Sequence, residues 1–131
     1  MAFRYRVKTK CSTLKEKKKK YYAVPIRNEK VQIAYLAEEL SHRCSLSKGD
    51  VLSALSGLVD LMEEHLHNGD SVYLDNLGIF TLSATSDGFD SPEECTPSKV
   101  RAQKICFRAD NKLKKNLQFV KFERDKHEVE L

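Results

Sequence analysis

The basic side chains are the residues whose number and spacing point most directly to a chemistry. Residues 1–30 hold eleven Lys and Arg against two acids, and residues 99–131 hold ten against five, whereas the middle of the chain is acidic. Ammonium and guanidinium groups bind phosphate through charge-assisted hydrogen bonds. If the two ends meet in space, the chain has a one-sided basic face suited to a polyanion.

The candidate phosphate contacts form two groups, a run of four lysines near the N-terminus and a spaced set near the C-terminus. They are Lys17, Lys18, Lys19, Lys20, Lys99, Arg101, Lys104, Arg108, Lys112 and Lys114. The lysine run is equally well explained as a solvated loop that keeps the chain soluble. Tyr21 and Tyr22 follow that run and offer rings for base stacking, although tyrosines that bound a strand are more often core or subunit contacts.

Residues 69–95, between these two groups, contain no Lys or Arg. Four acids gather toward the end of this stretch, namely Asp87, Asp90, Glu93 and Glu94. Carboxylates at such a position are repelled by a phosphate backbone. We therefore expect this segment either to fold back or to serve another role, with Phe89 packing the tip against its own chain or meeting a partner.

Other chemistries find little support. The cysteines Cys11, Cys44, Cys95 and Cys106 form no C-x-x-C pair and match no zinc template. No hydrolase, metalloprotease or phosphate-loop motif is present, so we expect no enzyme activity, metal, cofactor or small-molecule substrate. No apolar run approaches the roughly 20 residues of a membrane helix, and the N-terminus lacks the apolar region of a secretory signal. We expect a cytoplasmic protein.

The N-terminal segment, residues 1–30, predicts a basic β-hairpin. Phe3, Tyr5 and Val7 alternate with basic residues, which is typical of a half-buried strand. A second β-prone run, YYAVPIR, contains Pro25 and therefore predicts an edge strand. The lysine run would lie at the tip between the two strands.

Two helices joined by a tight turn are predicted next. Apolar residues recur at i, i+3, i+4 and i+7 from Ile33 to Leu40, which indicates an amphipathic helix that ends near Cys44. Ser47 and Asp50 form a plausible cap for the second helix. Gly69 accepts the left-handed conformation that stops that helix.

The second helix has more apolar surface than the short helix before it can cover. Its stripe, taken with an apolar residue of the following strand, gives the predicted dimer interface of Leu52, Leu55, Leu58, Val59, Met62, Leu66 and Phe80. Each buried Leu contributes roughly 1.5–3 kcal/mol, so exposure of the stripe would be costly. We expect an obligate dimer.

Strand alternation returns after Gly69. Gly78 lies inside the second of two short strands, which indicates a bulge, a bend or a close backbone approach. Residues 83–99 contain SDGFDSPEECTPS, which predicts a loop or a weakly ordered ribbon tip, and residues 100–107 predict its returning strand. A short helix that carries Leu113 and Leu117 follows, and residues 120–131 predict a last strand and tail.

This order of elements resembles the bacterial HU and integration host factor family of histone-like DNA-binding proteins. The best local matches are LSKGDV, NGDSVYLDNLGIF and ICFRADNKLKKNL, and the resemblance covers roughly residues 32–118. The N-terminal extension with KKYYAVPI looks like that of longer HU-like variants with an added β-hairpin. The resemblance implies an α+β, IHF-like fold over residues 31–119, with a two-helix dimerisation base, a three-stranded antiparallel sheet with a ribbon arm, and a short C-terminal helix.

The same resemblance implies a nucleoid-associated protein that binds double-stranded DNA as a homodimer. In the family, two ribbon arms wrap the minor groove and a proline near each tip wedges between base steps. Pro92 lies within about a residue of that position, and Arg108 and Lys114 match basic positions of the last strand and final helix. Asn111 departs from a family lysine. The larger departure is the missing positive charge on the outgoing strand and tip, which implies weakened arm contacts.

Two alternatives remain open from the sequence. One is a dimeric protein-interaction scaffold whose acidic arm contacts a basic partner, with reduced or lost DNA binding. The other is attachment to a membrane surface through the lysine run, for which the sequence shows no lipidation signal or apolar anchor.

Overall fold

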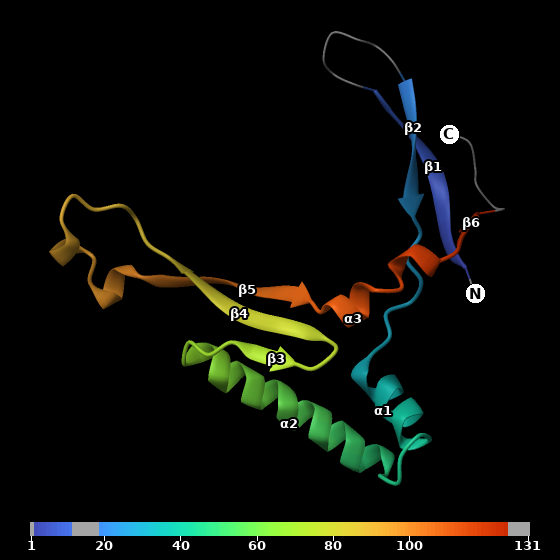
Figure 1. The fold of residues 1–131 in the computed structure, drawn as a ribbon, viewed down its shortest axis with the longest axis horizontal. Helices are drawn as coiled ribbons and strands as arrows, with labels where there is room; N and C mark the ends of the chain where they lie inside the picture. Colours follow the sequence, from blue (N-terminus) through green and yellow to red (C-terminus); the bar gives the residue numbers. More distant parts are fainter. Residues whose placement is uncertain (1, 12–18, 126–131) are drawn as a thin grey trace. The chain divides into compact units, whose positions relative to one another are not determined.

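The computed structural model describes residues 2–11 and 19–125, which fall into two compact units. The N-terminal unit combines Met1–Lys30 with Asn116–Leu131, and the central unit is Val31–Lys115 (Figure 1). Residues 116–125 therefore belong to the same unit as the N-terminal hairpin.

The N-terminal unit contains a three-stranded sheet built on the predicted hairpin. Strand β1 (Phe3–Cys11) pairs antiparallel with β2 (Lys19–Pro25), and the strand order is β2-β1-β6. Pro25 ends an edge strand, as its missing N–H predicts. Lys17 and Lys18, expected at the hairpin tip, lie outside the described residues.

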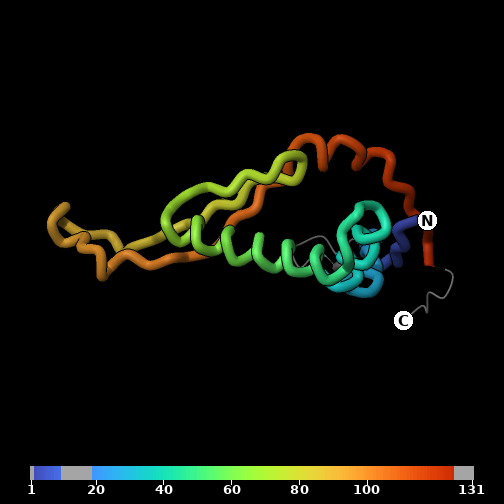
Figure 2. The backbone as a smooth tube through the Cα atoms, turned by 90° about the horizontal axis from the view of Figure 1, so that it is seen from below, coloured from blue at the N-terminus to red at the C-terminus, as the bar shows by residue number. Residues whose placement is uncertain are grey.

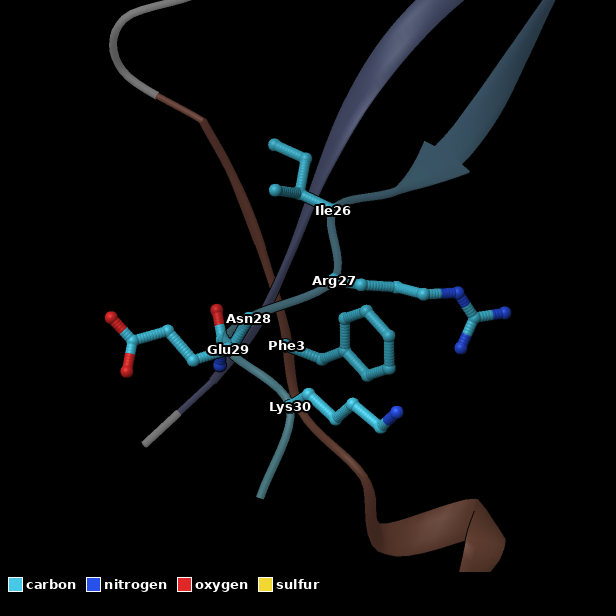
Figure 3. A pocket seen from close by; sticks show the side chains of 6 residues that line it. All are labelled: Phe3, Ile26, Arg27, Asn28, Glu29 and Lys30. Atoms are coloured by element: carbon cyan, nitrogen blue, oxygen red, sulfur yellow. The ribbon is translucent and has the colours of Figure 1, made fainter. Parts of the chain in front are cut away.

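The last strand, β6 (Phe122–Arg124), runs parallel to β1 and completes this sheet. Phe3 lies opposite Phe122, and their ring centroids are 5.6 Å apart. A single 3₁₀ turn, η3 (Leu117–Phe119), precedes the strand. Beside the sheet is an open hollow lined by Phe3 and residues 26–30, where the Phe3 ring lies between the side chains of Arg27 and Lys30 (Figure 3).

The central unit begins with the two predicted helices, α1 (Ile33–Ser41) and α2 (Lys48–His67). Helix α1 ends three residues before the predicted Cys44, because the chain continues from Ser41 in a tighter turn. The Asp50 amide donates to Ser47 Oγ at 3.1 Å, which confirms the predicted N-cap. Gly69 has a φ of +90° just beyond α2, as the stop signal requires.

A three-stranded antiparallel sheet follows, in the order β3-β4-β5. Its strands are β3 (Val72–Leu74), β4 (Gly78–Thr85) and β5 (Arg101–Ala109). Helix α2 contacts β3 and β4 and lies along one side of the sheet (Figure 1). This helix–sheet layer is the body of the central unit.

Strands β4 and β5 extend past α2 as a ribbon. The tip between them contains two 3₁₀ turns, η1 (Pro92–Glu94) and η2 (Pro97–Lys99). Figures 1 and 2 both show the tip reaching beyond the end of α2. The ribbon is thus extended and does not fold back onto the helices of its own unit.

The final helix is shorter than predicted. Helix α3 (Asn111–Lys114) has one turn, and Asn116 leaves the helical region with φ −104° and ψ 15°. Asn competes for backbone hydrogen bonds through its own side chain and is a weak helix former. The prediction that Leu113 and Leu117 share one helix is therefore wrong.

Candidate nucleic-acid interface

The basic residues of β5 are arranged by the register of the ribbon. Lys104 pairs with Ser83 and Arg108 pairs with Ile79, which places both on one face of the sheet. Strict alternation would put Arg101, three residues before Lys104, on the opposite face. The observed register differs from that expectation.

A shift in the β4–β5 register brings Arg101 onto the same face. Ser83 pairs with Lys104, but the next residue of β4 pairs with Ala102, so Gln103 is extra on β5. A β-bulge of this kind resets the alternation by one residue. Arg101 therefore pairs with Thr85 and shares a face with Lys104 and Arg108. We call these three residues the β5 basic row.

The base of the ribbon is held by a close backbone approach at Gly78. Its φ is +151°, and a Cβ there would collide with the Arg108 carbonyl oxygen and lie 2.7 Å from a ring carbon of Phe107. Only glycine fits at this point. The prediction of a close approach at Gly78 is confirmed. This approach brings the β4 backbone against the β5 backbone at Arg108 and Ala109.

Asp110 anchors the start of α3, which carries Lys112 and Lys114. One carboxylate oxygen accepts from the Lys112 amide at 3.3 Å and the other accepts from the Tyr73 hydroxyl at 3.1 Å. The hydrogen bond to this carboxylate and its negative charge raise the pKa of Tyr73 above its ordinary value. The Asp110 amide also donates to the Leu77 carbonyl at 2.9 Å.

At the tip, the basic residues contact residues of the tip itself. Arg101 lies 3.8 Å from a carboxylate oxygen of Asp87, and both side chains are largely exposed. The Lys99 ammonium lies 4.9 Å from the centre of the half-buried Phe89 ring. Within the described residues, no ion pair involves Lys104 or Arg108. Positive charge is therefore more available at the base of the ribbon than at its tip.

Pro92, the predicted wedge, is exposed at the tip and opens turn η1. Glu93 and Glu94 follow it within the same turn. Proline at the first position of such a turn needs no partner for its missing N–H. Its intercalating role stays a prediction.

The opposite face of the sheet is apolar and only partly covered. Phe80 and Phe107 pair across β4 and β5, with ring centroids 4.8 Å apart. Helix α2 covers the β3 and β4 side, whereas Phe107 is 49% exposed and Ile105 is 55% exposed on β5. Of the described hydrophobic residues, only Ala37, Val51 and Leu66 are buried.

The predicted dimer residues differ in how far their own chain covers them. Leu58 and Val59 are exposed on α2, whereas Leu66 is buried. The remaining four are half-buried, namely Leu52, Leu55, Met62 and Phe80. Together with Ile105 and Phe107, they leave much apolar surface open in a single chain.

Lys19 and Lys20 begin β2 in the N-terminal unit and are exposed. Over the part of the chain that the structure describes, no helix is long and apolar enough to span a membrane. No group of three metal-binding side chains comes together among residues 2–11 and 19–125.

Comparison with known proteins decides the family. A family model described as an HU domain fused to a wHTH, Ig or glycine-rich motif matches residues 1–124. The chain belongs to this HU-HIG family. The match includes the N-terminal hairpin and β6 as well as the central unit, so the two-unit organisation lies within the matched span. The suspected HU relationship is confirmed. A search of the curated proteins found no match.

Solved structures show the same fold at low identity. A DNA-binding protein from Bacteroides vulgatus is similar with a TM-score of 0.62 and 8% identity, over 94% of this chain. The chain described here spans about half of that protein, 48% of its length. An Anabaena HU–DNA cocrystal structure is similar with a TM-score of 0.51 and 15% identity, over 66% of this chain and 97% of that one.

Sequence reasoning identified the basic residues of β5 but not their common face. The bulge is the missed feature, because the sequence of β5 does not mark the point where its pairing with β4 shifts. The ion pair of Arg101 with Asp87 was also missed, because it joins residues across an irregular tip.

Proposed function

We propose that this chain is a nucleoid-associated, architectural protein that binds double-stranded DNA without sequence specificity. The central unit, together with the turn up to residue 119, is the DNA-binding domain, and it acts as a homodimer. The observation that carries the proposal is the common face of Arg101, Lys104 and Arg108 on a ribbon of an HU-like fold. Contacts of this kind bind phosphates and carry no sequence information.

The homodimer is supported by the half-covered sheet. Phe107 and Ile105 are open on β5, while α2 covers only the neighbouring strands. A second copy is the occupant that fits, because the same α2 and sheet surfaces are open on it. Association would remove the exposed apolar area of both chains from water at once.

The ribbon is proposed to contact DNA weakly at its end and more strongly at its base. Lys104, Arg108, Lys112 and Lys114 are the proposed main contacts, and Arg101 and Lys99 are weaker ones because of their tip partners. Four carboxylates at the tip oppose approach to a groove of negative potential.

Titration with duplex DNA over a range of salt concentrations tests the proposal. The variant Lys104→Gln/Arg108→Gln should weaken binding to all sequences alike and flatten the salt slope by about 1.8, since each phosphate contact contributes about 0.9. The matched control is Arg43→Gln/Lys48→Gln, which removes the same charge at the α1–α2 turn. Equal losses in both variants, or no duplex binding by the unaltered chain at low salt, would refute the proposal.

The wedge role of Pro92 is tested separately by DNA bending. Energy transfer between dyes at the two DNA ends should be the same for Pro92→Ala as for the unaltered chain, because exposed carboxylates flank the proline. A loss of bending would show that the arm wraps DNA despite its charge.

A second candidate function is supported by the same tip. Asp87, Asp90, Glu93 and Glu94 are all exposed on a segment that extends away from α2. Such a surface suits a basic protein partner, and a chain that dimerises but fails the duplex titration would favour it.

A further inference from the structure

The N-terminal sheet has a second basic surface. Arg4, Arg6 and Lys8 alternate along β1, so their side chains share one face of the sheet and neighbours are roughly 6.5–7 Å apart. Lys8 lies opposite Tyr22 and Arg6 lies opposite Val24 on β2. Lys20 shares their face, because it lies two residues before Tyr22.

We call Arg4, Arg6, Lys8, Lys20 and Tyr22 the hairpin basic face. All five side chains are exposed. Its row of three cations lies on β1, which is the central strand and pairs with β2 on one side and β6 on the other. Strand β6 pairs with β1 only at Phe3–Tyr5, whereas Arg6 and Lys8 are held by their pairing with β2. Pairing in a sheet holds alternate side chains at a regular spacing along one face.

Acids do not neutralise this face. Strands β1 and β2 contain no Asp or Glu, and Glu123, opposite Arg4, is the one acid that β6 adds to the face. Among the ion pairs between described residues, none involves Arg4, Arg6, Lys8 or Lys20. Clustering like charges costs folding stability, so a row of cations with a single acid opposite one of them indicates binding of a polyanion.

The opposite face of the same sheet carries mainly apolar and aromatic side chains. It carries Phe3, Tyr5 and Val7 of β1 and Phe122 of β6. Lys19 also belongs to it, since adjacent residues of a strand point to opposite faces. Lys19 and Lys20 therefore form a natural pair for comparison, with the same charge, the same strand and opposite faces.

We propose that the hairpin basic face is a second contact surface for the phosphate backbone of duplex DNA, in addition to the β5 basic row. This inference rests on the proposed function. Charge complementarity selects a nucleic acid as the occupant. A duplex is favoured over a single strand because Tyr22 is the only aromatic residue of this face within the described part of β1, β2 and β6, whereas single-strand sites use several stacking rings.

The test is a duplex titration across salt concentrations with two kinds of variant in the full chain. Arg6→Gln/Lys8→Gln should lower the salt slope by about 1.8, and Lys20→Gln should lower it by about 0.9. Lys19→Gln, which removes the same charge from the other face, should lower the slope by less than Lys20→Gln does. Circular dichroism should show that all variants are folded, because every altered side chain is exposed.

The possible outcomes separate this inference from the proposed function. If Lys104→Gln/Arg108→Gln lowers the slope but the hairpin variants do not, the proposed function stands and the hairpin basic face has another occupant, such as an acidic protein. Equal losses for Lys19→Gln and Lys20→Gln would show an effect of net charge alone and overturn the inference. Loss of binding to a single-stranded oligonucleotide, with duplex binding intact, would also overturn it. Failure of the unaltered chain to bind duplex would refute the proposed function itself.

Discussion

The two three-stranded sheets of this chain both alternate basic and apolar residues. They differ in what lies against their apolar faces and in how many acids accompany the basic residues. In the central unit, α2 covers part of the apolar face, and the ribbon ends in an acidic tip that pairs with Arg101. In the N-terminal unit, the described residues form one 3₁₀ turn and no α-helix, and β1 and β2 contain no acid. An amphipathic strand pattern thus predicts a sheet with two unlike faces, but not what meets either face.

The difference also concerns how each sheet is joined. The central sheet is continuous in sequence, and its strands pair in the order of the chain. The N-terminal sheet takes β6 from the far end of the chain, about a hundred residues after β2. The central unit can therefore form from local contacts, whereas the N-terminal sheet needs a long-range pairing with a higher loop-closure cost.

The largest expected effect is on subunit association through the central sheet. Phe107→Asp places a charge on the half-open apolar face next to Phe80, and we expect the dimer to dissociate and its fold to be lost together. Light scattering and circular dichroism measure both. Phe122→Asp, at a comparably exposed aromatic of the other sheet, should leave the dimer intact. A folded, dimeric Phe107→Asp protein would contradict the proposed interface.

The next effect concerns the base of the ribbon. Gly78→Ala should destabilise the protein by about 2 kcal/mol or more, because the new Cβ meets the Arg108 backbone at a φ that disfavours side chains. The control is Gly88→Ala at the tip, where a Cβ meets nothing within 4 Å. That change should stay within about 0.5 kcal/mol of the unaltered chain. Urea denaturation compares the two, and equal effects would show that the close approach at Gly78 is unimportant.

A smaller effect is expected at the acidic tip. Asp87→Asn removes the carboxylate beside Arg101 and should strengthen duplex binding severalfold, with a steeper salt slope. Asp90→Asn removes the same charge without a recorded ion pair within the described residues, and it should have a weaker effect. If both variants bind duplex DNA with the same affinity, the effect comes from net charge alone, and the ion pair with Asp87 does not restrain Arg101.

The smallest effect is electrostatic and local. Tyr73 should ionise above its ordinary pKa of 10.0, because its hydroxyl donates to the Asp110 carboxylate. A raised folded-state pKa means that this contribution to stability is present below pH 10 and is lost as the pH rises through the folded pKa. Asp110→Asn keeps a helix cap but removes the charge, so the pKa of Tyr73 should fall toward 10.0. Ultraviolet titration against Tyr73→Phe identifies the group, and an unchanged pKa in Asp110→Asn would contradict this cause.

Local signals in the sequence determined the elements of this protein. The Ser47 cap, the stop at Gly69, the edge position of Pro25 and the close approach at Gly78 all appear where their chemistry requires them. Each depends on a few adjacent residues and on backbone conformations that those residues favour or forbid. The family resemblance rested on the order of these elements, and the HU-HIG match confirms it.

The tertiary structure decided which residues act together. Arg101 joins Lys104 and Arg108 because the β4–β5 pairing shifts by one residue, and no alternation within β5 encodes that shift. The partner of β6 and the exposure of Phe107 likewise depend on contacts between segments distant in sequence. Such pairings are set by the balance of packing and loop closure across the whole chain. They therefore cannot be predicted from the sequence of one segment.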